Sequence, residues 1–430
     1  MHSSTPLLAR DLTELLAREL PGPLTVLDLR RVTGGTSRET WSFDVLDGEG
    51  ARHSLILRRE LRDGRTQHPG EPVSRTQDPA EPVGRTQDPG EPIGHTRHPA
   101  EPIGNTRHPA EPVSHTRHPN EPVSHTRHPN EPIGHTQHPG EPVSRHPGEP
   151  VSRTQKPDEP LGRNDALNLA DEFALLRYLH AVDIPVPRPL TASRPGDVLD
   201  CSVMERVDGE TRPWVLTRGG AFEELRPRLV RQLAAALARV HSRTAAELPL
   251  LPQRPLAGQL DRVRDLLDAG GPPRPALEAG LRWCRDRLPT IGPRPMRLVH
   301  GDFRTGNYAV GPDGLRALFS WKYAHIGDPV IDLGHACLRA WRFGAEDREC
   351  AGIGSRADFL AAYQAAGGTR VDERLVHYSE VLNTLMTAGL FLGRAQGFRS
   401  GVDRTVESAA AGRRIAEIEY DLLALLDRKP

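Results

Sequence analysis

The sequence has few of the features that mark secreted, membrane-spanning or nucleic-acid-binding proteins. Its four cysteines, Cys201, Cys284, Cys337 and Cys350, are scattered and form no Cys-x-x-Cys pair. This usage argues against a disulfide framework and predicts a reduced, cytoplasmic protein. No apolar run approaches the roughly 20 residues that span a bilayer, so a membrane partner is not expected. The net charge of −1 provides no basic surface for nucleic acid.

The first residues also lack the unbroken apolar core of a secretory signal. Leu8, Leu12, Leu15 and Leu16 recur at helical spacing, with charged residues between them. This pattern predicts an amphipathic helix rather than a signal peptide.

Residues 64–163 repeat a unit of ten residues that carries two prolines and a single valine or isoleucine, as in EPVSRTQDPA. Two prolines per unit interrupt helices and central strands. One aliphatic side chain per unit buries too little apolar area to offset the entropy lost on ordering. The segment is therefore predicted to be a disordered or polyproline-II insert in a globular chain.

Four of these repeats contain His-x-x-His, for example His95 with His98. Two interpretations are open: weak metal binding by imidazole pairs, or tandem duplication that copied a histidine. No cysteine lies beside these histidines, which favours duplication.

The chain on either side of the insert reads as an antiparallel sheet with one helix. Strands are predicted at 24–32, 40–46, 53–58 and 201–207, and a helix at 164–181 with Asn164 or Asp165 as its cap. Glu172 lies at the edge of the apolar stripe of that helix. It could turn inward to a strand cation such as Arg58, or remain solvated.

A glycine-rich turn joins the first two predicted strands and comprises Gly34, Gly35, Thr36 and Ser37. Such a turn can bring backbone amides to phosphate oxygens, although Gly-Gly turns also simply close hairpins. The sequence alone leaves both interpretations open.

The second half of the chain reads as helical from residue 222 onward. Helices are predicted at 258–269, 276–288, 355–366, 371–395 and 402–426. Among them, residues 298–334 contain the largest group of candidate functional side chains. An apolar strand ends in His300-Gly301-Asp302, Asn307 follows, and Gly327-Asp328 and Asp332 come later. A small β lobe before a larger α lobe predicts a ligand cleft between them.

These pieces, in this order, resemble the aminoglycoside phosphotransferase family of kinase-like enzymes. The similarity is closest to the branch of kinase-like domains fused to acyl-CoA dehydrogenases. It implies an α+β, protein-kinase-like bilobal fold with a small antiparallel N-lobe at 1–63 and 164–208 and a helical C-lobe at 209–430. The motifs that carry it are Gly34–Trp41, His300–Asn307 and Ala324–Pro329 with Asp332-Leu333.

The resemblance assigns nucleotide-binding roles to the N-lobe, with ATP or another nucleoside triphosphate and Mg²⁺ as cofactors. It implies that Gly34, Gly35, Thr36 and Ser37 cover the phosphates. Arg58 contacts the phosphates and Glu172 pairs with Arg58. Met204 and Glu205 belong to the hinge that meets the base.

The resemblance also assigns roles around the catalytic loop. Asp302 takes the position of the catalytic base, Asn307 that of a magnesium ligand, and Arg304 that of a substrate or phosphate ligand. Asp332 is expected to hold the loop in place. Asp328 could serve either as a metal ligand or structurally.

One motif departs from the family, which usually has Asp, Trp and Glu where this chain has Ser320, Trp321 and Lys322. The missing Asp is a magnesium ligand, and a neutral hydroxyl is a weaker ligand for a hard dication. Three interpretations follow: a working kinase with a weakened metal site, a pseudokinase that binds nucleotide or metabolite without transfer, or a chemistry in which Lys322 partly replaces metal charge.

The acceptor is expected to be a hydroxyl-bearing small molecule. No acidic cluster marks the C-lobe helices, which argues against a cationic aminoglycoside and favours a hydroxylated metabolite or an acyl thioester. Trp341 could line the acceptor pocket or pack in the core.

Overall fold

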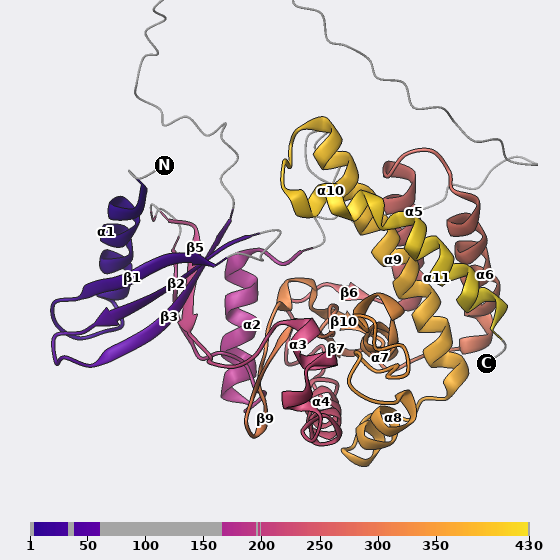
Figure 1. Cartoon of the computed structure of the whole chain (residues 1–430), viewed down its shortest axis with the longest axis horizontal. Helices are drawn as coiled ribbons and strands as arrows, with labels where there is room; N and C mark the ends of the chain where they lie inside the picture. The colour runs from indigo at the N-terminus through magenta and orange to yellow at the C-terminus, as the bar shows by residue number, and fades with distance from the viewer. Residues whose placement is uncertain (1–3, 33–37, 61–165, 195–196, 198, 429–430) are drawn as a thin grey trace, which may run out of the picture. The chain divides into compact units, whose positions relative to one another are not determined.

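The fold contains a small β-rich N-lobe and a larger helical C-lobe (Figure 1). The computed structural model describes residues 4–32, 38–60, 166–194, 197 and 199–428. The predicted insert at 64–163 and the glycine-rich turn at 34–37 lie outside the described residues.

The N-lobe is built on a five-stranded antiparallel sheet ordered β1-β2-β3-β5-β4. Because successive side chains of a strand point to opposite faces, Leu55 and Leu57 pack on one face and Ile56 and Arg58 point to the other. The strands are β1 (Thr25–Val32), β2 (Arg38–Leu46), β3 (Arg52–Glu60), β4 (Pro189–Ala192) and β5 (Cys201–Glu205).

Helix α1 (Ser4–Leu16) confirms the predicted amphipathic helix. Its four periodic leucines are buried in one cluster with Leu55, Leu57 and Val203 of the sheet. Burial of such leucine side chains contributes roughly 1.5–3 kcal/mol each, so the helix and the sheet face stabilise one another.

Helix α2 (Leu169–Ala181) contacts β4 and β5. It begins later than predicted, because Asn168 is the N-cap and its side chain accepts a hydrogen bond of 2.8 Å from the Asp171 N–H. The preceding residues 166–168 are not helical. The buried face of the helix includes Glu172 among its leucines, so this carboxylate lies inside rather than at the edge.

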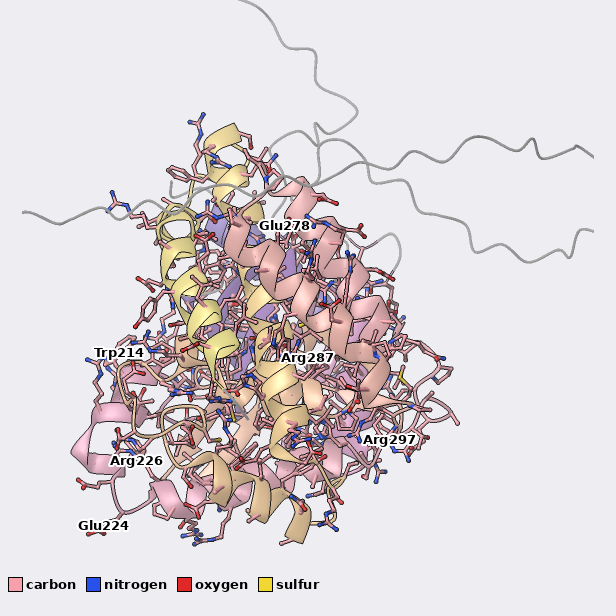
Figure 2. All side chains as sticks on the ribbon, turned by 90° about the vertical axis from the view of Figure 1, so that its right-hand side faces the viewer. Trp214, Glu224, Arg226, Glu278, Arg287 and Arg297 are labelled. Atoms are coloured by element: carbon pink, nitrogen blue, oxygen red, sulfur yellow. The ribbon has the colours of Figure 1, made fainter. Side chains whose placement is uncertain are left out.

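The C-lobe is organised around α9, the longest helix, which contacts α5, α6, α7, α10 and α11. Figure 2 views it from the α6 side, with Glu278 and Arg287 labelled on α6 and Trp214 and Arg226 near α3 and α4. Its helices are α3 (Pro213–Arg218), α4 (Arg226–Val240), α5 (Leu256–Ala269), α6 (Pro275–Ile291), α7 (Val330–Cys337), α8 (Arg356–Ala365), α9 (Glu373–Ser400), α10 (Val406–Arg413) and α11 (Ile415–Asp427).

The prediction of a single helix at 402–426 is wrong, because α10 and α11 meet at Arg414. Thr405 caps α10 and accepts a hydrogen bond from the Ser408 N–H, so residues 401–404 remain outside the helix. The break lets both helices pack on α9, whereas one straight helix could not bend around it.

Short strands frame the segment at 298–334. Strands β6 (Gln253–Arg254), β10 (His325–Gly327) and β7 (Arg297–Val299) form one small sheet. Strands β8 (Tyr308–Gly311) and β9 (Gly314–Leu318) form a hairpin. The candidate functional residues of this segment therefore lie in the loop between β7 and β8 and in the segment that follows β9.

The described residues bear on two expectations from the composition, which concern membrane-spanning segments and disulfide bonds. None of their helices combines the length and apolar character needed to cross a membrane. All four cysteines are buried free thiols, as expected for a chain without a disulfide framework.

Candidate active site

Asp302 lies in the loop between β7 and β8, and its Oδ1 has two side-chain partners. Arg304 Nε donates to it at 2.9 Å and His335 Nε2 lies at 3.3 Å. Burial would raise the pKa of Asp302, but the charge of Arg304, the hydrogen bond from His335 and the charge of Lys322 lower it below its ordinary value. The carboxylate is therefore ionised at neutral pH.

Asn307 and Arg304 are both fixed by this loop. The Asn307 amide nitrogen donates to the Asp302 carbonyl oxygen at 2.8 Å, which fixes the orientation of the amide. The Arg304 guanidinium lies over the Trp341 ring at 4.3 Å, a cation–π distance. Trp341 is 9% exposed, so it is both a core residue and a wall for Arg304.

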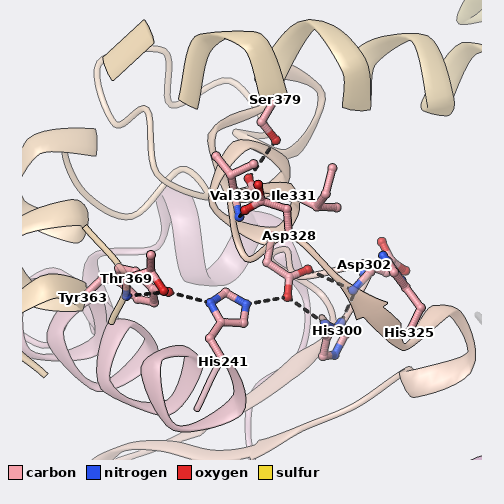
Figure 3. A network of polar contacts seen from close by, with 12 residues as sticks. His241, His300, Asp302, His325, Asp328, Val330, Ile331, Tyr363, Thr369 and Ser379 are labelled. Carbon is pink, nitrogen blue, oxygen red and sulfur yellow. Dashed lines mark hydrogen bonds and ion pairs between the residues drawn. The ribbon is translucent and has the colours of Figure 1, made fainter. Parts of the chain in front are cut away.

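Asp332 binds the backbone of the loop that leads to Asp302, in agreement with its expected structural role. Figure 3 shows the surrounding network, with His241, His300 and Tyr363 labelled. Its Oδ2 accepts the His300 N–H at 2.7 Å and its Oδ1 accepts the Gly301 N–H at 2.8 Å. His241 Nε2 lies 3.1 Å from Oδ2, and Tyr363 holds the other ring nitrogen at 2.8 Å. These bonds keep the pKa of Asp332 low although burial would raise it.

Gly301 meets a conformational requirement of the same loop. Its φ is +80°, a left-handed conformation that glycine adopts without penalty. A Cβ at this position would also collide with the Tyr323 carbonyl oxygen. The His-Gly-Asp sequence therefore lets the chain turn tightly enough to present Asp302.

Glu172 and Arg58 form the predicted ion pair in the N-lobe. Arg58 Nη1 donates to Glu172 Oε1 at 2.7 Å, and Glu172 is 2% exposed. Burial raises the pKa of Glu172, but the charges of Arg58 and Arg38 outweigh burial and leave the pKa lowered. The pair fixes α2 to β3.

The sequence interpretation missed Arg38, which pairs with the second carboxylate oxygen of Glu172. Arg38 also pairs with Glu60 at 2.8 Å and donates to the Leu167 carbonyl oxygen. A signal was available: Arg38 lies two residues from Thr40, which is paired with Arg58, so strand alternation places both arginines on one face.

Two cavities meet beside these residues. The first, called here the nucleotide cavity, has a volume of about 650 Å³ and is lined by Ile56, Met204, Glu205 and Phe319 among others. The second, called the acceptor cavity, has a volume of about 470 Å³ and contains Asp302, Arg304 and Asn307. Thr40, Arg58 and Ser320 line both cavities, so the two volumes join at these residues.

Ser320 lies at this junction in a left-handed conformation, with φ 67° and ψ 50°. Only small polar residues such as Asn and Asp adopt this conformation with some ease, so the backbone would accept the Asp that the family usually has. Lys322 lines the acceptor cavity and is 7% exposed. Its charge lowers the pKa of both Glu172 and Asp302.

The donors near the junction do not fit a tightly held magnesium ion. The described residues contain no group of three or more His, Cys, Asp and Glu side chains that could hold a metal. Asn307 and Ser320 offer neutral oxygens, whereas Mg²⁺ prefers carboxylates. Asp328 is directed elsewhere: Arg294 Nε donates to its Oδ2 at 2.9 Å, and its Oδ1 accepts the Val330 N–H. Asp328 lines neither cavity.

The antiparallel sheet, the Arg58–Glu172 pair, the helical C-lobe and the loop bearing Asp302 and Asn307 define a protein-kinase-like fold. The sequence profile of the phosphotransferase enzyme family, also called APH, matches residues 28–375. The chain belongs to this family, and the expected family and protein-kinase-like fold are confirmed. The expected likeness to the branch fused to acyl-CoA dehydrogenases stays a prediction. No curated protein matches the chain in sequence.

Solved structures agree on the fold. A candidate aminoglycoside phosphotransferase from Ralstonia eutropha JMP134 is 14% identical, with 98% of this chain and 99% of that chain covered and a TM-score of 0.60. A spectinomycin phosphotransferase in complex with ADP and spectinomycin is 10% identical, with 97% and 98% covered and a TM-score of 0.52. At these identities the likeness concerns the fold.

Proposed function

We propose that the protein transfers a phosphoryl group from ATP, or another nucleoside triphosphate, to a hydroxyl group of a small molecule. Membership of the phosphotransferase family supports this activity. The observation that carries the proposal is the position of Asp302: an ionised carboxylate in a cavity that shares Arg58 and Ser320 with the nucleotide cavity.

The nucleotide cavity supplies surfaces for the base and for the phosphates. Ile56, Leu176 and Met204 give it apolar walls, and Met204 and Glu205 lie on β5, where the family has its hinge. Arg58 stands at the junction, where its guanidinium can meet phosphate oxygens. Glu172 fixes the Arg58 side chain, so little side-chain entropy is lost when a phosphate binds.

In the transfer step, the acceptor hydroxyl donates a hydrogen bond to Oδ2 of Asp302. The hydroxyl oxygen forms a bond to the γ-phosphorus, while the bond from that phosphorus to the bridging oxygen breaks and the nucleoside diphosphate leaves. The hydroxyl proton passes to Asp302. Asp302 acts mainly by orienting the acceptor, because positioning dominates phosphoryl transfer.

Charge neutralisation at the transferred group is where this chain differs from its relatives. A bound magnesium ion would supply charge between the β- and γ-phosphates. Asn307 and Ser320 are the side chains that face such an ion here, and both are neutral. Arg58 and Lys322 supply positive charge from the protein itself. We infer a working transferase whose metal site is weakened.

A second candidate function is a pseudokinase that binds a nucleotide without transfer. The paired replacement at Ser320 and Lys322 favours it, because two carboxylates are lost and a cation is gained beside the junction. The retained Asp302, Asn307, Arg58 and Glu172 favour the transferase.

Nucleotide titration and turnover on the full chain separate the two functions. A working transferase binds ATP calorimetrically and releases ADP faster when a hydroxylated acceptor is added. A pseudokinase binds ATP and releases no ADP above the level of Asp302→Asn. A chain that binds neither ATP nor GTP contradicts both functions.

A further inference from the structure

The walls of the acceptor cavity carry an unusual excess of positive charge. Seven cationic side chains and two carboxylates line it. The cations are Arg38, Arg58, Arg262, Arg304, Lys322, Arg394 and Arg414, and the carboxylates are Asp302 and Glu407.

Some of these cationic side chains lie at the junction of the two cavities. The others lie on the C-lobe wall of the acceptor cavity. Arg38 and Arg58 pair with Glu172, and Arg304 pairs with Asp302. Three more arginines line the cavity: Arg262 on α5, Arg394 on α9, and Arg414 between α10 and α11. The charge of Arg394 also lowers the pKa of Asp403. Glu407 on α10 is the one carboxylate that these helices add to the described lining.

The arginines of this wall are half-buried rather than freely hydrated. Arg414 stacks over Phe391 at 5.5 Å and pairs with Glu417 at 3.2 Å. Glu417 is 65% exposed, and exposed ion pairs are weak, so a ligand anion can compete for this guanidinium. A polycationic acceptor would instead meet like charges on three sides.

Apolar side chains of α9 separate the catalytic loop from this wall. Asn383 donates to the Ile331 carbonyl oxygen, which ties this part of α9 to the helix that carries Asp332. Arg394 lies 11 residues further along, or about 16 Å at 1.5 Å per residue. Between them Met386, Leu390 and Phe391 line the cavity on one helical face.

We propose that the acceptor is a hydroxylated organic anion whose apolar segment joins its hydroxyl to a carboxylate or phosphate. This inference rests on the proposed phosphoryl transfer. The hydroxyl lies at Asp302, the apolar segment packs on Met386, Leu390 and Phe391, and the anionic group meets Arg394 and Arg414. Arginine binds both anion types through paired N–H donors.

Matched probes of one chain length test this assignment. The probes are 8-hydroxyoctanoate, 8-hydroxyoctyl phosphate, neutral 1,8-octanediol and cationic 8-aminooctan-1-ol. Their affinities for the full chain are measured by NMR titration with and without ADP. Both anions are expected to bind at least roughly tenfold more tightly than the amine. The affinity of the diol is expected to lie between those of the anions and the amine. The stronger of the two anions identifies the preferred anionic group.

Arg394→Gln is the test variant, because glutamine keeps much of the aliphatic stem and removes the charge. It should weaken binding of the anions about tenfold and leave the diol unchanged. Arg374→Gln, an exposed position on α9 that does not line the cavity, is the matched control and should bind as the wild type does. Thermal melting of both variants shows that they are folded.

The proposal is overturned if the amine binds as tightly as the anions. It is also overturned if all four probes bind equally well, or if none of them binds. ATP turnover measured on the same samples separates this outcome from failure of the proposed function. Turnover on a cationic acceptor refutes the anion site alone. Anion preference without nucleotide binding refutes the transferase alone.

Discussion

Arg58 of β3 and Glu172 of α2 form a hydrogen-bonded ion pair with an N–O distance of 2.7 Å. Arg38 pairs with the other oxygen of the same carboxylate. Glu172 is thus a buried anion between two cations, and its charge holds α2 to β2 and β3.

Neutralising Glu172 should destabilise the N-lobe. Glu172→Gln leaves Arg58 without its counter-ion and removes one of the two carboxylates that pair with the buried Arg38. Breaking such a buried pair costs about 3 kcal/mol. Urea unfolding measures this loss in the free energy of unfolding. Glu346→Gln is the control, because Glu346 pairs with Arg339 at the surface, where both are about half exposed, and should cost less than about 1 kcal/mol. Equal losses in the two variants contradict the account.

Restoring the family residues should raise activity. Ser320→Asp adds a carboxylate at the junction, and the left-handed backbone there accepts Asp. We expect Ser320→Asp/Lys322→Glu to raise ATP turnover with Mg²⁺ at least roughly tenfold, which corresponds to about 1.4 kcal/mol of barrier. Ser320→Ala controls for loss of the hydroxyl alone. High wild-type turnover that the double variant leaves unchanged would show that the replacement does no damage.

Replacement of Asp332 and replacement of Asp302 should have different effects on stability and on turnover. Asp332→Asn places a donor where three N–H groups converge, so it should cost about 2–4 kcal/mol of unfolding free energy together with activity. Asp302→Asn should cost less stability than Asp332→Asn, because Arg304 keeps its contact with the Trp341 ring, and it should lower turnover about 100-fold or more. Paired urea unfolding and ADP-release assays measure the split. A stable, inactive Asp332→Asn would contradict the structural role.

The stability of the chain should decline in weak acid because of His325. Burial and the charge of Arg254 lower its pKa from 6.5 to about 4. Its Nδ1 lies 2.9 Å from the Tyr323 carbonyl oxygen and its Nε2 lies 2.9 Å from the Gln259 amide nitrogen, a pattern that fits the neutral ring.

Because the unfolded chain takes up this proton at higher pH than the folded chain, stability is present above pH 6.5 and is lost as pH falls towards 4. The loss is at most about 1.4 kcal/mol per pH unit for one histidine. Urea unfolding at pH 7 and pH 5 should show a smaller decline in His325→Gln than in the wild type. Equal declines contradict the assignment to His325.

Local patterns were enough to predict the main parts of the site. The His-Gly-Asp segment, Asn307 and the structural role of Asp332 were all read from one stretch of about forty residues. The Arg58–Glu172 pair was predicted across the insert, because the resemblance linked two positions that composition alone leaves unrelated. The leucine spacing of α1 likewise identified the buried face of that helix.

Other features depend on contacts that periodicity does not encode. The direction of Asp328 depends on Arg294, and the partnership of His335 with Asp302 depends on how α7 packs under the loop. The start of α2 depends on whether Asn164 or Asn168 caps it. The positive wall of the acceptor cavity combines arginines from α5, from α9 and from the junction of α10 and α11, which no local pattern brings together.

The formation of ADP from ATP by the full chain with Mg²⁺, compared with Asp302→Asn across a panel of hydroxylated acceptors, tests the central claim most directly. The account predicts that at least one acceptor raises ADP release in the wild type and that Asp302→Asn lowers this release about 100-fold or more. Equal release by the two proteins with every acceptor, or no release by either, would contradict it.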